Sequence, residues 1–462
     1  MMNSFGASLF VLLGVLFGSA SAHAVEAKLT ADCLDKSRVE VLTKEFNIVT
    51  KGEATFNRCD PSTRTYRLLQ ALMYLQDLKL EAFRTSEFNN NFIDERPFDF
   101  FKARTRNIVV EPQGGCRKGY IAYVQMGEET QGLIHICDIS NQSVFQISST
   151  LLHEVRHLDP KDYAHIGCTH GMLMGSSGAC DARYEDGGSY AIGAEFYVKL
   201  ARSKNVDPVI RQEARASAVS VFQNSFNQYP LGLKQGALLK ATDGRFAFYD
   251  GDALRKFPME AAPHSLMVAR IRVPTLFNRD DSSVKSYNFG ARMVDTKGVF
   301  ADEFRNRMSY TQQKSLVDIA YGVNYDCKLF VRSIVCETEN GKTEKMLPDY
   351  KGMGLVSSKW TVSLQKGTLY LSADNGYLYA LPDKFEDFQK MAPKDWKRSP
   401  GIYHTKEVAF WDINTDIVLT NDGKIRFYIK ESKSWETSKM LTPYTFESMI
   451  APYIWSEKLE DL

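Results

Sequence analysis

The residues with the clearest chemical potential form the run HEVRH at positions 153–157. Two histidines four residues apart on an α-helix are turned by only about 40 degrees from each other, so both imidazoles can reach one ion. Histidine nitrogens are preferred ligands of Zn²⁺, which in catalytic sites takes three protein ligands and one water. Glu154 follows the first histidine and can act as general base toward that water. We therefore predict a zinc site on His153 and His157.

The segment around this run is predicted to be a helix over residues 142–158. Its apolar residues recur at spacings of three and four and form one face: Val144, Ile147, Leu151, Val155 and Leu158. Each histidine lies about 200 degrees from the apolar residue two positions before it, so the histidine pair faces away from the core. Side chains at 138–141 can cap the start of the helix, and Pro160 ends it.

This part of the chain resembles the zincin metallopeptidases, through HEVRH on a helix and the predicted strand 133–139 that leads into it. The resemblance spans about residues 107–203. It implies an α+β domain, a Zn²⁺ cofactor, Glu154 as the catalytic base, and a protein or peptide substrate aligned along an edge strand. The chain departs from the pattern HExxHxxGxxH, because Pro160 stands where the glycine should be.

A third ligand must come from outside the helix. His165 follows His157 by eight residues, two more than in that pattern, and is our preferred third metal ligand because of its residue type. Glu195 is the second candidate, since some zincins take a glutamate from a later helix. The remaining candidates are His170, Asp159 and Asp181. Tyr190 could donate a hydrogen bond to an oxyanion, although a buried core tyrosine is the commoner role.

The N-terminus and the cysteines predict export. An apolar run at 8–17 is followed by Ala20-Ser21-Ala22, which is typical of a signal peptide over residues 1–24, and no later segment reaches the roughly 18 apolar residues of a membrane span. The eight cysteines form sequential couples, and nearest-neighbour disulfides are the simplest pairing: 33–59, 116–137, 168–180 and 327–336. A 168–180 bridge would close a loop beyond His165 and hold that histidine over the helix. We expect a secreted or periplasmic protein.

Composition and missing motifs exclude several classes of function. The 57 basic and 56 acidic residues nearly cancel, so no basic surplus indicates a nucleic-acid partner. No GxSxG, Walker loop or GxGxxG in a strand-to-helix context occurs. The isolated His264 and His404 are expected to be structural.

The chain is predicted to be multidomain, with a zincin-like α+β domain over 25–230 and a mostly β domain over 231–462. The second part contains strand, Asp/Asn-Gly turn, strand patterns at 238–248, 369–379 and 417–428. Turn glycines at 244, 298, 341, 376 and 423 recur at intervals near the 40 to 50 residues of a propeller blade, so a β-propeller of about five blades is favoured over a sandwich.

Together these features favour an exported zinc metallopeptidase whose β-rich domain recognises protein targets. The alternative is a non-catalytic secreted binding protein with a structural or vestigial zinc site. A zinc hydrolase acting on a non-peptide amide is a third possibility.

Overall fold

The computed structural model divides the chain into two compact units, which are described separately. The first contains residues 1–233 and Ser456–Leu462, and the second consists mainly of Lys234–Asn288 and Arg292–Trp455. The structure describes residues 33–52, 56–81, 91–112, 114–116, 121–125, 127, 131–140, 142–159, 163–169, 178–261, 265–270, 273–277, 284–288, 293–294, 316–320, 326–330, 333–338, 341–347, 355–362, 367–373, 378–382, 384–395, 397–399, 405–412 and 414–461. The predicted signal peptide lies outside these ranges.

The first unit is a four-stranded mixed sheet with helices. The sheet has the order β1-β2-β4-β3, in which β1, β2 and β4 are parallel and the edge strand β3 is antiparallel. Its strands are β1 (Ile48–Thr50), β2 (Asn107–Val110), β3 (Ala122–Tyr123) and β4 (Leu133–Ile136). The helices are α2 (Lys36–Glu45), α3 (Arg64–Asp77), α4 (Pro97–Arg104), α5 (Val144–Arg156), α6 (Ser189–Arg202) and α7 (Pro208–Asn224). The predicted α+β character of this part is therefore present.

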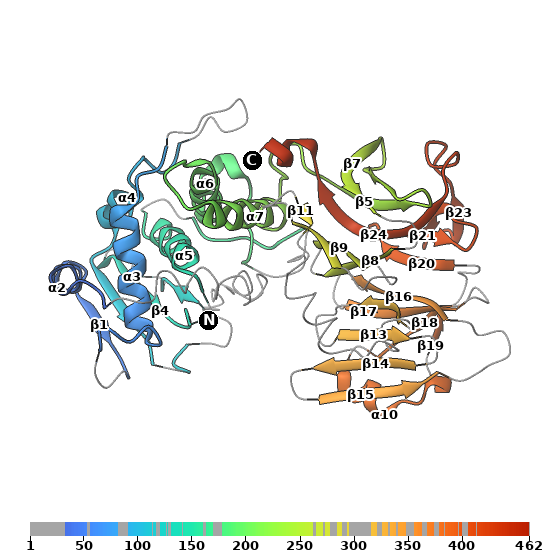
Figure 1. Ribbon diagram of the computed structural model, residues 1–462, viewed down its shortest axis with the longest axis horizontal. Coiled ribbons are helices and arrows are strands. Elements are labelled where there is room, and N and C mark those ends of the chain that lie inside the picture. The colour runs from blue at the N-terminus through green and yellow to red at the C-terminus, as the bar shows by residue number, and fades with distance from the viewer. Residues whose placement is uncertain are drawn as a thin grey trace, which may run out of the picture. The chain divides into compact units, whose positions relative to one another are not determined.

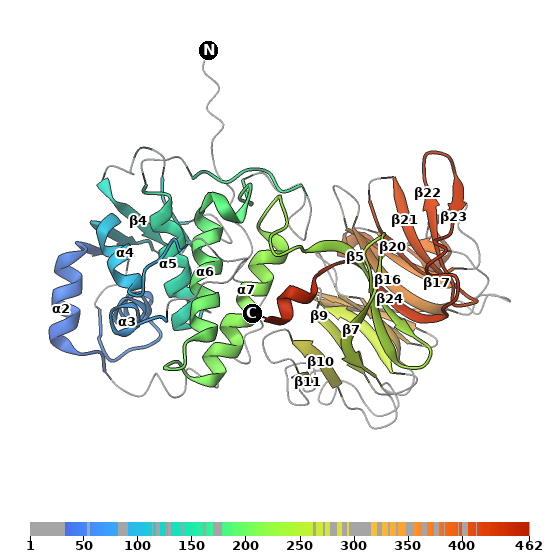
Figure 2. The same ribbon diagram turned by 90° about the horizontal axis from the view of Figure 1, so that it is seen from above.

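Four of these helices lie in sequence across the unit, with α3 against α5, α5 against α6 and α6 against α7 (Figure 2). Helix α5 begins after Ser143, whose backbone N–H donates to Gln146 Oε1 at 2.9 Å. The cap is thus a few residues later than the capping side chains expected at 138–141. All five residues of the predicted apolar stripe are buried, which confirms the face that α5 turns to the core.

The leucines within residues 64–83 recur at spacings of three and four, which predicts a helix over this range, but α3 ends at Asp77. Leu78 is already extended, and the N–H of Leu80 donates to Glu95 O at 2.8 Å. Both leucines are buried, so the burial of apolar side chains continues past the helix on an extended segment that bonds to Glu95. The prediction was wrong here because periodicity cannot distinguish a buried extended segment from one more helical turn.

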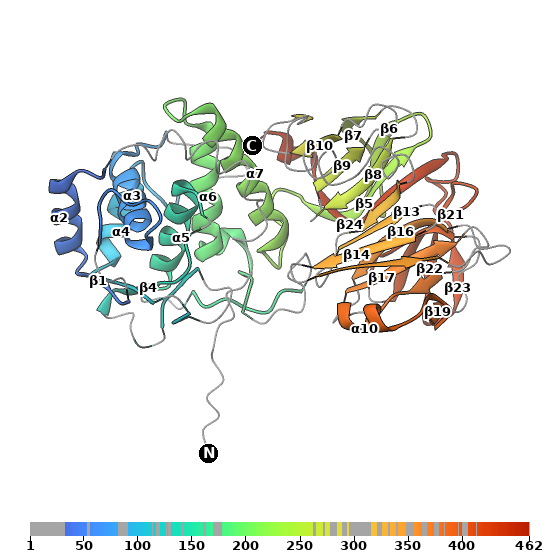
Figure 3. The same cartoon turned by 60° about the horizontal axis from the view of Figure 1, so that its bottom comes forward.

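The second unit contains five four-stranded antiparallel sheets among its described residues (Figures 1 and 3). Their strands are, sheet by sheet, β24 (Phe446–Trp455), β5 (Lys234–Ala241), β6 (Arg245–Tyr249) and β7 (Leu254–Glu260); β8 (Leu266–Arg270), β9 (Val273–Phe277), β10 (Val284–Asn288) and β11 (Met293–Val294); β12 (Leu316–Ala320), β13 (Asp326–Phe330), β14 (Ser333–Thr338) and β15 (Gly341–Met346); β16 (Leu355–Val362), β17 (Gly367–Ala373), β18 (Leu378–Ala380) and β19 (Lys397–Ser399); β20 (Thr405–Phe410), β21 (Thr415–Thr420), β22 (Ile425–Ile429) and β23 (Ser434–Glu436). A short helix, α10 (Phe385–Lys390), packs near β14.

One sheet of this unit joins the two ends of the β-rich region. The late strand β24 pairs with the early strand β5, seen as the red strand beside the yellow-green one in Figures 1 and 3. The first strands of successive sheets also touch: β8 contacts β12, β12 contacts β16, β16 contacts β20, and β24 contacts both β20 and β8. Glu407 on β20 accepts hydrogen bonds from Ser448 Oγ and Met449 N on β24, at 3.0 and 2.7 Å.

The three predicted hairpins are confirmed as the pairs β5–β6, β17–β18 and β21–β22. Gly244 and Gly423 have left-handed φ values of 86° and 78° in turns between the second and third strands of their sheets. Gly341 instead begins β15, the fourth strand of its sheet. The glycines at 298 and 376 lie outside the described residues. The intervals between the predicted turn glycines therefore do not mark the same position in successive sheets.

The four disulfides follow the predicted nearest-neighbour pairing, and all eight cysteines take part. Such a set points to an extracellular or periplasmic location, where thiols are oxidised. In the part of the chain that the structure describes, we find no helix with the length and apolar character that crossing a membrane requires.

After β24 the chain returns to the first unit, which the predicted division at 230/231 did not include. Helix η4 (Glu457–Asp461) contains the fully buried Leu459, and Arg215 Nη2 on α7 donates to Leu459 O at 3.0 Å. Ser456 Oγ donates to Leu231 O at 2.9 Å. These contacts hold the end of the chain against α7 and the residues that follow it.

Candidate metal centre

Three histidines converge in the first unit. His153 lies in the last turn of α5, His157 is the residue that caps the end of α5 in a right-handed helical conformation, and His165 lies eight residues further on. One ligand atom from each of the three lies within 4.8 Å of the others. This is the set that the sequence predicted, and it could hold a metal ion.

The spacing of the ring nitrogens matches a shared ion. His153 Nε2 and His165 Nε2 are 3.2 Å apart. Two nitrogens that bind one tetrahedral ion at the usual zinc distance are separated by about 3.3 Å. The ring centroid of His157 lies 5.3 Å from that of His153 and 4.8 Å from that of His165. The plane of the His157 ring is steeply inclined to the planes of the other two rings, so His157 approaches the common centre from a different side.

The outer sides of the rings are hydrogen-bonded. His165 Nδ1 lies 2.8 Å from the carboxylate Oδ1 of Asp181, and we assign the proton to Nδ1 because a carboxylate can only accept. Burial lowers the pKa values of His153 and His157 well below their usual value, and backbone hydrogen bonds with Ser189 and with Tyr163 oppose this shift. A bond that favours the protonated ring is one in which the ring donates.

These outer bonds leave nitrogen lone pairs on the inner side. With Nδ1–H of His165 held by Asp181, the Nε2 of this ring carries a lone pair and lies 3.2 Å from His153 Nε2. A neutral imidazole with an inward lone pair is the form that binds a metal ion. Burial and the neighbouring His165 also lower the pKa of His157 well below its usual value, which keeps that ring neutral, as metal binding requires. The residues present therefore fit a metal ion.

Asp181 connects His165 to the start of α6. Its Oδ1 accepts from His165, and its Oδ2 accepts from the backbone N–H groups of Tyr190 and Ala191 at 2.9 and 3.4 Å. A carboxylate at a helix N-terminus is stabilised by the unpaired N–H groups there. Asp181, considered as a ligand in the sequence, thus lies behind the ligand His165 and fixes its ring.

Glu154 is buried beside the triad, with 3% of its surface exposed. Among the described residues, its Oε2 has no hydrogen-bond partner. Burial alone raises the pKa of the Glu154 carboxyl to about 8. A carboxyl in such surroundings can hold or release a proton near neutral pH.

Tyr190 closes one side of the site. Its ring centroid is 4.8 Å from that of His153 and 4.7 Å from that of His165, and its side chain is buried. Burial, followed by the charges of Asp181 and Glu154, raises the pKa of the phenol far above its usual value, so Tyr190 stays protonated. Tyr190 packs on two of the histidines. Neither role considered from the sequence, oxyanion donor or core tyrosine, predicted this contact.

Arg156, inside the HEVRH run, ties α5 to the segments around it. Its Nε donates to Gly187 O at 2.7 Å, its Nη2 donates to Tyr163 Oη at 2.7 Å, and its Nη1 pairs with Asp159 at 2.6 Å. Asp159 also pairs with Arg104 at 2.8 Å. These ion pairs engage the carboxylate of Asp159, another candidate ligand, which does not belong to the cluster of the three histidines. No pattern in the sequence predicted that Arg156 would bridge these segments.

The other candidate ligands fall elsewhere or outside the described residues. Glu195 on α6 accepts from the N–H groups of Phe92 and Ile93 at 2.8 and 3.1 Å and pairs with Lys199 at 2.7 Å. It therefore secures the segment 91–93 and is absent from the histidine cluster. His170, His264 and His404 lie outside the described residues.

Comparison with known proteins adds weak likenesses only. No protein-family model matches the chain, and no curated protein matches it. Among solved structures, YCF48 from Cyanidioschyzon merolae matches with 10% identity and a TM-score of 0.25, covering 45% of this chain and 70% of its own. Apo AztD from Citrobacter koseri matches with 8% identity and a TM-score of 0.21, covering 48% and 74%. BBS1N, solved in complex with ARL6DN, matches with 11% identity and a TM-score of 0.25, covering 47% and 81%. TM-scores this low say nothing about what this chain does.

Proposed function

We propose that this chain is an exported zinc-dependent metallopeptidase. The observation that carries the proposal is the convergence of His153, His157 and His165 beside Glu154, a buried carboxyl with an oxygen that has no partner among the described residues. Three histidines suit zinc better than Mg²⁺ or Ca²⁺, which prefer oxygen ligands. The four disulfides support the exported location.

In the proposed reaction, His153, His157 and His165 would hold the zinc ion, which supplies Lewis-acid chemistry: it lowers the pKa of a water molecule and polarises a carbonyl. Asp181 keeps the His165 ring oriented through its 2.8 Å bond to Nδ1. The free Oε2 of Glu154 takes the proton of the attacking water and delivers it to the leaving amine nitrogen. Tyr190, packed on two of the rings, excludes water from that side of the site.

We further propose that the five sheets of the second unit are the blades of a β-propeller that recognises protein targets. Support comes from the contacts that run through the first strands β8, β12, β16, β20 and β24 and return to β8. The pairing of β24 with β5 would then close the circle, as late and early strands do in propellers. The proposed hydrolysis would take place in the first unit.

The test of the peptidase is Glu154→Gln in the full-length protein. We expect the variant to retain a stoichiometric amount of zinc while cleavage of a peptide library falls by about 10²–10⁴-fold, the usual contribution of a general base. His153→Ala is the companion variant, and it should lose both zinc and cleavage. Zinc content is measured by elemental analysis, and cleavage is measured with and without a chelator.

The same experiment distinguishes the non-catalytic alternative. A protein that only binds its targets would hold zinc in the wild type and in Glu154→Gln but show no chelator-sensitive cleavage in either. Failure of the wild-type protein to take up any zinc would refute both versions of the site.

A further inference from the structure

We propose that Asn227, which follows α7, is a positioning residue of the metal centre. It holds the segment that carries His165 where this imidazole meets His153 and His157. The inference rests on the proposed metal site and adds to it a residue 62 positions away from His165 in the sequence. The same residue also contacts Asp181, the carboxylate that orients the His165 ring.

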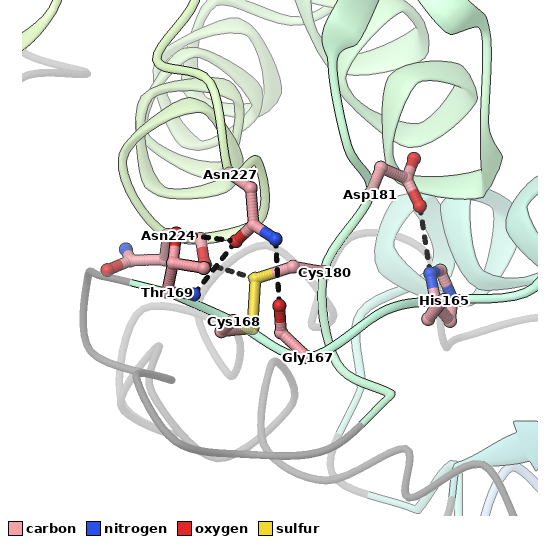
Figure 4. Close-up of a disulfide and its surroundings, with 8 residues drawn as sticks. All are labelled: His165, Gly167, Cys168, Thr169, Cys180, Asp181, Asn224 and Asn227. Carbon is pink, nitrogen blue, oxygen red and sulfur yellow. Dashed lines mark hydrogen bonds and ion pairs between the residues drawn. A yellow bond between two sulfur atoms is a disulfide. The ribbon is translucent and has the colours of Figure 1, made fainter. Parts of the chain in front are cut away.

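Three short segments lie side by side at this place (Figure 4). The segment after His165 pairs with the residues around Cys180, where the Ile166 N–H donates to Cys180 O at 2.7 Å. That segment in turn pairs with the end of α7, where the Asp181 N–H donates to Ser225 O at 2.9 Å. The backbone carrying His165 is thus connected to α7 through the backbone that carries Asp181.

The Asn227 side chain reaches the first segment directly. Its Nδ2 donates to Gly167 O at 2.7 Å, and its Oδ1 accepts from Thr169 N at 2.9 Å and from Thr169 Oγ1 at 3.2 Å (Figure 4). The backbone N–H of Asn227 donates to Asp181 O at 3.0 Å. A single residue therefore bonds the peptide groups on both sides of Cys168 and the main chain of Asp181.

A planar amide is the side chain that fits this task. One end must donate to a carbonyl and the other must accept from an N–H two residues away, and an aspartate in the same place offers only acceptors. The Cys168–Cys180 disulfide joins the segment after His165 to the segment around Cys180. It connects them through two side chains and does not bond their peptide groups. The amide of Asn227 fixes the backbone itself, only two residues from His165, and so limits how far the imidazole can move from the other two ligands.

The experiment compares three variants of the full-length, disulfide-bonded protein. Asn227→Ala removes both side-chain bonds, and Asn227→Asp keeps the bond to Thr169 but places an acceptor against Gly167 O. Asn107→Ala is the matched control, because Asn107 also donates to a backbone oxygen, of Gln131 at 2.8 Å, and accepts from a second residue, Asn47, at 2.8 Å. The control removes bonds of the same kind at the start of β2, a strand that carries none of the three histidines.

Zinc affinity is measured by competition with a chromophoric chelator, and the ligand geometry is read from the visible absorption of the Co²⁺-loaded protein. We expect both Asn227 variants to bind zinc about 10-fold more weakly, at the lower end of the effect of residues behind metal ligands, and to show an altered Co²⁺ spectrum. Asn107→Ala should match the wild type in both readouts.

Two results overturn the inference while the metal site stands. One is wild-type zinc affinity together with an unchanged Co²⁺ spectrum in both Asn227 variants. The other is an equal loss of affinity in Asn107→Ala, which would assign the effect to general loss of stability. If the wild-type protein binds neither Zn²⁺ nor Co²⁺, the proposed function fails first, and the role of Asn227 falls with it.

Discussion

The ion pair between Lys199 and Glu195 on α6 offers a quantitative test of how the first unit is held together. Both side chains are buried, with 2% and 4% exposed, and they meet at 2.7 Å. Lys199 Nζ also donates to Asn91 Oδ1 and Ile93 O. Lys199→Met would leave the Glu195 carboxylate buried without its counter-charge, which costs about 3–5 kcal/mol. That is a large share of the roughly 5–15 kcal/mol that stabilises a domain.

The loss should depend on pH in a defined direction. Burial raises the pKa of Glu195, although Lys199 and the N–H groups of Phe92 and Ile93 oppose it. A carboxyl with a raised pKa in the folded state stabilises the fold fully below its unfolded pKa of about 4.3, and this contribution is lost as the pH rises through the folded pKa. Without Lys199 the folded pKa rises further. The deficit of Lys199→Met relative to the wild type should therefore shrink as the pH falls from neutral toward about 5.

The two units can be followed separately in denaturant titrations. All five tryptophans lie at or beyond residue 360, in the second unit, so fluorescence follows that unit. Far-UV circular dichroism follows the helices, of which α2 to α7 belong to the first unit. We expect Lys199→Met to shift the dichroism transition and to leave the fluorescence transition in place.

A second substitution isolates the charge. In the double variant Lys199→Met with Glu195→Gln, neither position of this pair carries a charge. The free energy of unfolding should therefore return to within about 1–2 kcal/mol of the wild type. The reasoning is refuted if Lys199→Met loses less than about 1 kcal/mol, if its deficit grows toward acid pH, or if the double variant is as unstable as the sum of the two single variants.

Two further predictions concern the metal centre and the second unit. Asp181→Asn should weaken zinc binding about 10–100-fold, because one amide oxygen cannot accept from both His165 Nδ1 and the α6 N-terminus; chelator competition measures this, and unchanged affinity would contradict it. Replacing both Cys327 and Cys336 by serine should lower the stability of the second unit by roughly 2–3 kcal/mol, since their bridge joins β13 to β14. The fluorescence transition should shift and the dichroism transition should not; the reverse result would refute it.

Features that depend on local spacing could be predicted from the sequence. The apolar stripe of α5 and the hairpins β5–β6 and β21–β22 depend on residues that lie close together in the sequence. Adjacent cysteines paired because short loops close at low entropic cost. The approach of His153 to His157 belongs to the same class, since it follows from helix geometry alone.

Features that depend on distant partners could not be predicted in the same way. The apolar spacing after Asp77 fits a helix as well as the observed extended segment, which is distinguished by the extended backbone of Leu78 and the bond from Leu80 N to Glu95 O. Glu195 has the residue type and helix position of a ligand. What removes it from that role is Lys199 together with the N–H groups of Phe92 and Ile93, which no spacing rule relates to it.

The segment around Gly187 and Gly188 shows how such a constraint can still leave a trace in the sequence. The two glycines indicate only a loop when read alone. In the structure Gly187 has a left-handed φ of 65° and its carbonyl accepts from Arg156, while a Cβ on Gly188 would lie 2.4 Å from Asp181 Oδ2. A side chain at 188 would displace the carboxylate that bonds both α6 and His165. Gly188 is thus required by the histidine cluster, because only its small size lets Asp181 approach the helix and the imidazole at once.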